Sequence, residues 1–557
     1  MLVLALLVLS SSSPAGATSP GPYAVDGVDI DALMDSLTLE EKVGQLLLLG
    51  FGGSKMDQTI EAFIEDMLPG GLALFGRNIQ APLQTLKLIR DIRSHDPAAH
   101  LGGIPMFIAV DQEGGTVVRL KKHATILPSA MALGAVHDVD LARRAGRALG
   151  EDLKLFGFNM NMAPVLDVNS NPNNPVIGIR SFGEDPASVA EIGVAYVEGL
   201  QSAGVIAVAK HFPGHGDTDS DSHYHLPVLP HDRQRLDEVE LLPFSRAFAE
   251  GLDAIMTAHI ALPGLGGPQA DLPATVSARV LTTLLRNELG YQGLVMTDGL
   301  EMQGIVARFG SGEAAVRAVL AGADVVMVLW YPEKKREVRD ALLSAARSGR
   351  LPAQRLHEAV RRVLLAKAKR GLFSRELVPV DAALAQLRHL DRSVVGEIAR
   401  KAITLVHNDG VLPLKRGARV VVASTERGFS RLLAKKMGAR TLSLAHAPTR
   451  TRIDVDSARL VAMAKDADVV VIGLQNLDHR ALVDRVRSQT RAKIVVVSFG
   501  SPYLAQRLAP VNAYLCAFGW RAESAKAAAL ALLDVKKATG IMPVTLSQGA
   551  KVGTRQP

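Results

Sequence analysis

Short apolar runs recur along the first two thirds of the chain and alternate with longer amphipathic stretches. Eight of these runs are predicted strands, at residues 45–51, 71–75, 106–111, 159–167, 206–211, 254–259, 294–298 and 325–330. The segments between them include four with helical spacing, at residues 141–155, 187–202, 277–289 and 312–321. Thr38 and Glu41 form a predicted capping box at the start of the first helix. Strands that alternate with helices are parallel, so this pattern predicts an α/β fold with a (β/α)8 TIM-like barrel.

A second group of apolar runs follows the predicted barrel. Near-continuous stretches of Val, Ile and Leu predict four more strands, at residues 419–424, 467–474, 493–499 and 513–518. Such runs are typical of a buried parallel sheet in an α/β/α sandwich domain. No Gly-x-Gly-x-x-Gly pattern follows the third of them, so no dinucleotide site is predicted. We expect a barrel over residues 28–375, a connector over 376–395 and the sandwich domain over 396–557.

The N-terminus reads as a leader. Met1–Leu9 is apolar, and Ser10–Ser13 and the small residues Ala15-Gly16-Ala17 follow it, which predicts a signal peptide over residues 1–17. No Lys or Arg precedes the apolar run, which makes its beginning atypical. The run is too short to span a bilayer as a helix, so no membrane span is predicted. We therefore expect a secreted or periplasmic protein.

Composition narrows the classes of function. Hydrophobic residues make up 48% of the 557 residues and charged residues 21%, as in ordinary globular proteins. The net charge of +7 is spread as isolated Lys and Arg, and aromatic residues are only 4%, so nucleic-acid binding is not predicted. The single cysteine, Cys516, lies in an apolar run and excludes both an intrachain disulfide and a site with several thiolates.

The densest group of chemically active residues follows the fifth predicted strand. Lys210-His211-Phe-Pro-Gly-His-Gly216 comes first, and Asp221-Ser-His223 follows after four residues. Pro and Gly place these residues in a loop. A carboxylate two residues from an imidazole favours general acid/base chemistry near neutral pH. Two alternatives stay open from the residues alone, namely a structural role or metal binding by His211, His215, His223 and His225.

Three further motifs lie at or just after strand ends. Asp298 ends the seventh strand, where a barrel carries its nucleophiles, although such an Asp can instead cap the next helix. Glu301 lies just beyond it with no assigned role. Asp111 ends the third strand, and Arg119 follows shortly after. Arg180 comes after the fourth strand and offers a charged guanidinium with several hydrogen-bond donors for a ligand. Alternatively, Arg180 forms a structural ion pair.

Together these motifs resemble the bacterial β-N-acetylglucosaminidase (β-hexosaminidase) branch of glycoside hydrolase family 3. The run at 210–216, the four-residue gap and Asp221-Ser-His223 match that branch at every position, and the resemblance extends from Leu37 to the end, including residues 404–413. It implies Asp298 as nucleophile and His223, assisted by Asp221, as acid/base. It also implies five substrate-binding residues, which are Asp111, Arg119, Arg180, Lys210 and His211. No metal or organic cofactor is implied.

The predicted activity is that of a retaining exo-glycosidase. It would hydrolyse terminal non-reducing β-linked N-acetylglucosamine from peptidoglycan fragments or chitooligosaccharides through a covalent glycosyl-Asp intermediate. A phosphorylase is an alternative, because an imidazole tolerates an anionic acceptor better than a Glu would. A catalytically silent sugar-binding protein of the same fold is another. A β-glucosidase is disfavoured by Gly299, where those branches typically carry Trp.

Overall fold

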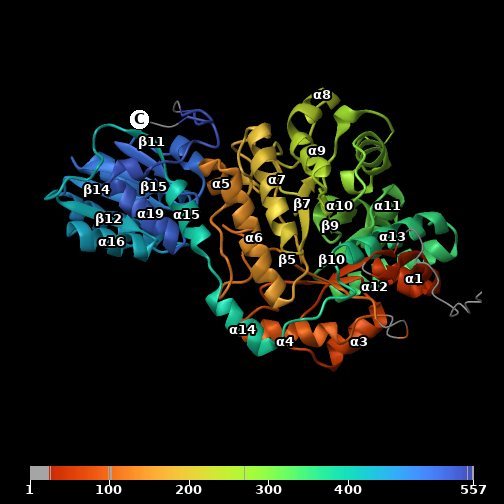
Figure 1. Ribbon diagram of the computed structural model, residues 1–557. Helices are drawn as coiled ribbons and strands as arrows, with labels where there is room; N and C mark the ends of the chain where they lie inside the picture. The colour runs from red at the N-terminus through yellow and green to blue at the C-terminus, as the bar shows by residue number, and fades with distance from the viewer. Residues whose placement is uncertain are drawn as a thin grey trace, which may run out of the picture.

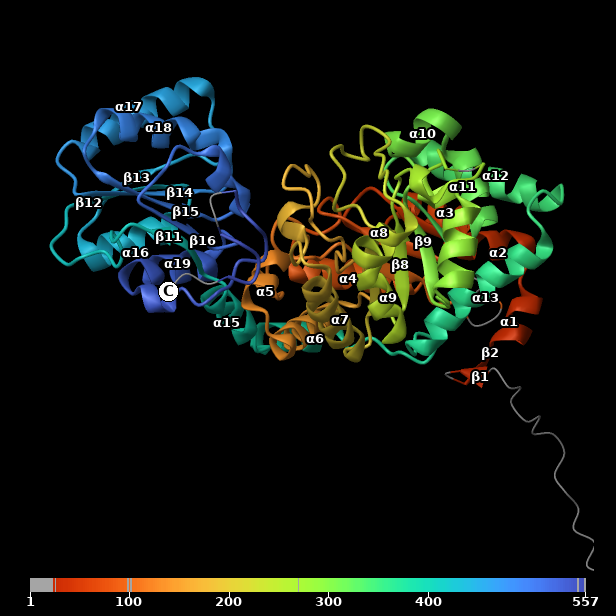
Figure 2. The same ribbon diagram turned by 90° about the horizontal axis from the view of Figure 1, so that it is seen from above.

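The computed structural model describes residues 24–25, 27–97, 100, 103–268, 270–547 and 550–554. The predicted signal peptide lies outside these described residues. Figures 1 and 2 show two bodies side by side, a barrel wrapped by helices and a smaller body built around a single sheet. Within the described part of the chain, no helix combines the length and apolar character that crossing a bilayer requires.

Eight parallel strands close into a barrel in the order β10-β3-β4-β5-β6-β7-β8-β9, which confirms the predicted barrel. The strands are β3 (Leu47–Gly50), β4 (Gly71–Leu74), β5 (Phe107–Val110), β6 (Met160–Asn161), β7 (Ile206–Phe212), β8 (Ala254–Thr257), β9 (Leu294–Gly299) and β10 (Val325–Val328). Each corresponds to a predicted strand. β6 is much shorter than predicted because Pro164 has no N–H to donate to the ladder, and pairing resumes at a bridge between Val165 and Lys210.

Helices surround the barrel and alternate with its strands. They are α1 (Ile30–Ser36), α2 (Leu39–Gln45), α3 (Gln58–Met67), α4 (Pro82–Arg93), α5 (Ala130–Val136), α6 (Val139–Phe156), α7 (Pro186–Ser202), α8 (Arg233–Arg235), α9 (Leu242–Ala249), α10 (Gln303–Phe309), α11 (Ser311–Ala321), α12 (Pro332–Arg347) and α13 (Ala353–Lys369). The capping box at Thr38 and Glu41 is present at the start of α2. The helix predicted at 277–289 has π-helical hydrogen bonding over Arg279–Glu288.

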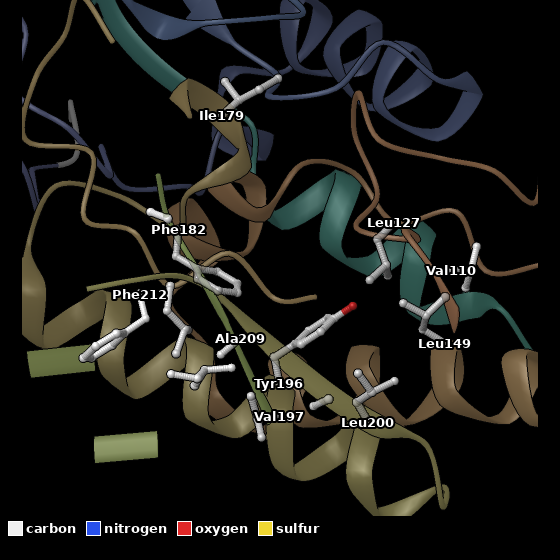
Figure 3. Close-up of a cluster of buried hydrophobic side chains, with 14 of the residues drawn as sticks. Val110, Leu127, Leu149, Ile179, Phe182, Tyr196, Val197, Leu200, Ala209 and Phe212 are labelled. Carbon is white, nitrogen blue, oxygen red and sulfur yellow. The ribbon is translucent and has the colours of Figure 1, made fainter. Parts of the chain in front are cut away.

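The barrel strands and their helices share an apolar core, part of which is shown in Figure 3. Tyr196, Val197 and Leu200 of α7 belong to the same hydrophobic cluster as Ala209 and Phe212 of β7, and all five are buried. Full burial of an aliphatic side chain stabilises the fold by about 1.5–3 kcal/mol. This packing fixes α7 against β7, the strand that carries the Lys210–His211 pair.

The second body is an α/β/α sandwich, as predicted. Its sheet has the order β11-β16-β15-β14-β12-β13, in which β11 is antiparallel to β16 and the other pairs are parallel. The strands are β11 (Thr404–Asn408), β12 (Val420–Ser424), β13 (Arg440–Ser443), β14 (Val469–Leu474), β15 (Lys493–Ser498) and β16 (Ala513–Cys516). The four predicted strands are confirmed. β11 and β13, which the apolar pattern did not predict, are the two edge strands.

Helices cover both faces of this sheet. They are α15 (Ser393–Lys401), α16 (Arg427–Met437), α17 (Arg450–Ala464), α18 (Arg480–Gln489) and α19 (Ala522–Leu533). Figure 2 shows α17 and α18 on one face and α16 and α19 on the other. The segment predicted as a connector contains one further helix, α14 (Val380–His389), which packs against α4 and α6 of the barrel.

The two bodies contact each other beside the mouth of the barrel. Ser129, at the start of α5, donates from its backbone N and its Oγ to the carbonyl oxygen of Phe518, at 3.2 and 2.6 Å. The side chain of Asn169, after β6, donates to the Tyr503 hydroxyl at 3.1 Å. The second body is therefore bonded to loops that leave the carboxyl ends of the barrel strands.

A lysine is buried at the opposite end of the barrel. Lys367 of α13 has no exposed surface, and its Nζ donates to Gln45 Oε1 at 2.6 Å. Burial lowers the pKa of Lys367 to about 7, and the opposing effect of Asp96 is smaller. The pKa of Lys367 is lower in the folded protein than in the unfolded chain. The full free-energy cost of burying its charge therefore applies below pH 7. That cost diminishes as the pH rises from 7 towards 10.5.

We expect Lys367→Met to change the pH dependence of stability. The difference in the free energy of unfolding, variant minus wild type, should decrease by roughly 3 kcal/mol between pH 6 and pH 9, because one pKa unit corresponds to about 1.4 kcal/mol. Thermal unfolding of both proteins at the two pH values measures this difference. Lys435→Met, at an exposed position of α16, is the control and should show no such change. A pH-independent difference for Lys367→Met would contradict the prediction.

Candidate active site

A cavity of about 400 Å³ opens at the carboxyl ends of the barrel strands. Seven of the eight predicted site residues line it, namely Asp111, Arg119, Arg180, Lys210, His211, His223 and Asp298. The eighth, Asp221, is bonded to His223. The strand ends of a (β/α)8 barrel meet at this face, which is why residues almost two hundred positions apart share one pocket.

Asp298 ends β9 at the wall of this cavity. Its Oδ1 accepts a hydrogen bond from the backbone N of Gly299 at 2.7 Å. Burial raises the pKa of Asp298, but the electrostatic effects of His259 and His211 outweigh burial and leave that pKa below its ordinary value. Asp298 is therefore a carboxylate at neutral pH, as a nucleophile must be.

His223 and Asp221 form the predicted pair. Asp221 Oδ1 lies 2.7 Å from His223 Nδ1 and also accepts from the backbone N of His223 at 2.9 Å. The carboxylate favours the tautomer with a proton on Nδ1 and stabilises the imidazolium. His223 Nε2 is then the nitrogen that can exchange a proton with a substrate in the cavity.

The loop that carries this pair is bonded to the start of α10. The backbone N of Gly304 donates to Ser222 O at 3.2 Å, and the backbone N of Gln303 donates to His223 O at 3.3 Å. Below the loop, His215 Nε2 lies 3.1 Å from Ser222 Oγ. Burial lowers the pKa of His215 to about 4, so this imidazole is neutral. The segment after Asp298 thus positions the Asp221–His223 pair.

A substitution at Gly304 tests whether the start of α10 positions the loop that carries Asp221 and His223. A Cβ at this position would lie 2.9 Å from the carbonyl oxygens of Ser222 and His225, closer than real Cβ contacts allow. We expect Gly304→Ala to displace the loop and to lower kcat/KM by about ten-fold or more, since small misplacements of catalytic groups are costly. Gly428→Ala is the matched control, because it is also the second residue of a helix and meets open space. Equal kinetics for both variants would contradict the prediction.

A buried cluster of charges lies at the base of the cavity. Lys210 Nζ is 2.9 Å from Asp111 Oδ1 and 2.7 Å from Glu113 Oε1. Arg180 donates to both oxygens of Glu113, each at 2.9 Å. Burial opposes the charge of Lys210, but Asp111 and Glu113 outweigh burial and raise its pKa above the ordinary value. Arg119 is less tightly engaged, with NH2 at 3.6 Å from Asp111 Oδ2.

Glu113 was not singled out from the sequence. It lies two residues after Asp111, but nothing in the surrounding sequence distinguishes Glu113 from a solvated acidic residue. In the structure the side chain is 7% exposed and joins Lys210 to Arg180. Burial raises the pKa of Glu113, and the two cations more than reverse that effect. Glu113 therefore stays ionised and holds both cations in the cavity.

Asp167 and His259 are two further strand-end residues that received no role from the sequence. Asp167 is buried, with Oδ2 at 2.7 Å from His211 Nδ1 and Oδ1 accepting from the backbone N of His211 at 3.0 Å. His259 Nε2 lies 3.0 Å from the carbonyl oxygen of Gly299, next to Asp298. A carbonyl only accepts, so His259 Nε2 carries a proton. Both residues orient neighbours that line the cavity.

Lys210 and His211 are consecutive, yet both line the cavity. In a regular strand they would point to opposite faces. The pairing of β7 with β8 shifts register between Lys210 and Phe212, which permits both side chains to reach the mouth of the barrel.

Three of the four histidines considered as metal ligands have other side-chain partners. His211 is bonded to Asp167, His215 to Thr218 and Ser222, and His223 to Asp221. Among the described residues, one group of possible metal ligands converges, namely Asp217, His231 and Glu240, and it includes none of these histidines.

Comparisons with known proteins agree with this geometry. The family model described as "Glycosyl hydrolase family 3 N terminal domain" matches residues 38–366, more than half of the chain. A protein named β-hexosaminidase A from Pseudoalteromonas piscicida is 36% identical over 420 residues, which cover 69% of this chain and 70% of that protein. A β-hexosaminidase from Nitrosomonas eutropha is 35% identical over 56% of this chain and 90% of its own length.

Among solved structures, a family 3 β-N-acetylglucosaminidase from Paenibacillus sp. is 35% identical. It superposes with a TM-score of 0.83 over 93% of this chain and 100% of its own. A β-glucoside phosphorylase superposes with a TM-score of 0.79 at 23% identity, over 94% of this chain and 96% of its own, a likeness that concerns the fold alone. The chain therefore belongs to glycoside hydrolase family 3 and, within it, to the bacterial β-hexosaminidase branch.

Proposed function

We propose that this β-hexosaminidase removes terminal β-linked N-acetylglucosamine from the non-reducing end of glycans with retention of configuration. The observation that carries the proposal is the meeting, in one cavity, of an ionised Asp298 and the Asp221–His223 pair. A retaining mechanism requires one group that attacks C1 and a second that protonates the leaving oxygen. The names of the relatives support N-acetylglucosamine as the sugar.

The reaction would proceed in two steps. Asp298 attacks C1 as the bond from C1 to the leaving oxygen breaks, and His223 Nε2–H protonates that oxygen. Water then attacks C1 of the glycosyl-Asp intermediate, His223 takes its proton, and the Asp298 carboxylate is released. Asp221 keeps the proton on Nδ1 and orients the imidazole through both proton transfers. The Asp111, Arg180, Lys210 and His211 side chains would hold the sugar hydroxyls, with Arg119 as an outer contact.

The glycans that we favour are peptidoglycan fragments or chitooligosaccharides. A net charge of +7 suits an anionic polymer such as the cell wall, and a secreted or periplasmic location, as the leader predicts, would give access to both. Gly299 leaves space beside the nucleophile, since a Cβ there would meet nothing closer than Glu301 Oε2 at 3.5 Å. A larger residue would occupy this part of the cavity.

The test is a comparison of 4-nitrophenyl β-N-acetylglucosaminide with the matching β-glucoside, and proton NMR of the first-formed product. We expect a preference for the N-acetylglucosaminide and a β-configured product. A preference for the glucoside would contradict the substrate, and an α product would contradict retention. Repeating the assay in phosphate separates hydrolase from phosphorylase, because a phosphorylase would form the sugar 1-phosphate. Binding of the sugar without turnover would indicate the silent sugar-binding protein.

A further inference from the structure

Two exposed aromatic side chains, Trp330 and Tyr331, lie on the loop that follows β10 at the mouth of the cavity. Their exposed fractions are 54% and 55%, and both line the cavity. The chain contains only two tryptophans, and one of them leaves a large apolar side chain exposed to water at the rim of a pocket. Exposed aromatic rings beside a pocket present large apolar area for a ligand to cover.

Trp330 is held firmly on one side. The Arg77 guanidinium lies 4.2 Å from the centroid of the Trp330 ring, and the Phe75 ring lies 5.1 Å away at an angle of 42°. Arg77 is itself fixed by hydrogen bonds of 2.8 Å to the carbonyl oxygens of Phe51 and Leu329. A cation against an aromatic face stabilises the ring position. The ring is thus braced from within, and its remaining surface faces solvent.

Glu301, which the sequence left without a role, fixes the same loop. Its Oε1 accepts from the backbone N of Leu329 at 2.7 Å and from the backbone N of Trp330 at 2.5 Å. Burial raises the pKa of Glu301, and these backbone hydrogen bonds oppose that effect. The largely buried Glu301 carboxylate therefore fixes the position of the exposed Trp330.

The position of this loop relative to the acid/base pair follows from one short segment, residues 298–303. It carries the nucleophile Asp298, it holds His223 through the backbone N of Gln303, and it holds Trp330 through Glu301. A leaving group must come within hydrogen-bond reach of the acid that protonates it. The charged groups that suit the cleaved sugar are buried at the base of the cavity, so the leaving group lies towards its open rim, where Trp330 and Tyr331 are exposed.

We propose that Trp330 and Tyr331 form an acceptor subsite that stacks against the pyranose ring of the leaving-group sugar. This inference rests on the proposed function and adds the chemical class of the leaving group. The charged wall of the cavity, formed by Asp111, Lys210 and Arg180, suits the hydroxyls of the sugar that is cleaved. The aromatic wall suits the apolar C–H face of the next sugar. The preferred substrates are then oligosaccharides, and glycosides with small alkyl leaving groups are poorer.

The test compares a leaving group that has a ring with one that has none. Wild type, Trp330→Ala and Trp330→Phe are assayed on N,N′-diacetylchitobiose and on 2,2,2-trifluoroethyl β-N-acetylglucosaminide. For Trp330→Ala we expect kcat/KM to fall about ten-fold on the disaccharide and to stay within about two-fold on the trifluoroethyl glycoside. Trp330→Phe keeps an aromatic ring and should retain most of the activity on the disaccharide. Glu301→Gln should lose activity on the disaccharide selectively, though less than Trp330→Ala.

Two results would overturn the subsite. One is an equal loss on both substrates for Trp330→Ala, and the other is no loss on the disaccharide. Val455→Ala, at an exposed apolar residue of α17 in the second body, is the control and should leave both activities unchanged. Failure of the wild type to release N-acetylglucosamine from both substrates would instead contradict the proposed function, so the two failures are distinguishable.

Discussion

Asp298→Ala should lower kcat on any β-N-acetylglucosaminide by about 10⁴-fold or more, while the protein folds as before. The carboxylate is the group placed to form a covalent bond to C1, and removal of a nucleophile costs several orders of magnitude. Its pKa is lowered by His259 and His211 despite burial, so no other protonation state of Asp298 contributes near neutral pH. Steady-state kinetics and the thermal unfolding temperature of the variant measure both parts of the expectation.

Added azide gives a sharper form of this test. The shortened side chain leaves room for a small anion, which would attack C1 and yield the α-glycosyl azide as His223 protonates the leaving oxygen. Restored turnover with that product identifies Asp298 as the nucleophile. Asp140→Ala, at a highly exposed residue of α6, is the control and should keep wild-type activity. Near-normal activity of Asp298→Ala without azide would contradict the assignment.

The fold followed from the sequence wherever strands were buried on both faces. All eight barrel strands and four strands of the second sheet lie in buried, mainly apolar runs, and each was found. The exceptions are edge strands. β13 has three of four side chains exposed, so it reads as a polar loop, and β11 joins the sheet antiparallel after a helix rather than as part of a βα unit. Pairing of such edges depends on distant partners, which local patterning does not encode.

The seven predicted residues that line the cavity were predictable because each one ends or closely follows a strand and belongs to a recognisable motif. The residues that orient them were not. Glu113, Asp167 and His259 act through hydrogen bonds to partners 40 to 97 positions away, as Asp167 does with His211 over 44 positions. Glu301 likewise bonds to a loop 28 positions later. Such partners become visible only when the barrel closes.

Glu113→Gln should have the second largest effect. The substitution keeps the shape of the side chain but removes the charge that joins Lys210 to Arg180, which leaves two buried cations with weaker compensation. We expect kcat/KM to fall about a hundred-fold, because the side chains that we propose bind the sugar hydroxyls lose their positions. The free energy of unfolding should fall by roughly 3 kcal/mol, as is typical when one partner of a buried ion pair is removed.

The pH profile separates a positioning role of Glu113 from a purely structural one. Glu113 is one of two carboxylates that raise the pKa of Lys210, so its removal lowers that pKa. The lysine then loses its charge at a lower pH, and the alkaline limb of the kcat/KM profile should move to lower pH in Glu113→Gln. Glu333→Gln, at an exposed position of α12, should leave the profile unchanged. An unmoved alkaline limb together with a lowered unfolding temperature would show that Glu113 serves stability alone, since the charge of Lys210 would then be independent of it.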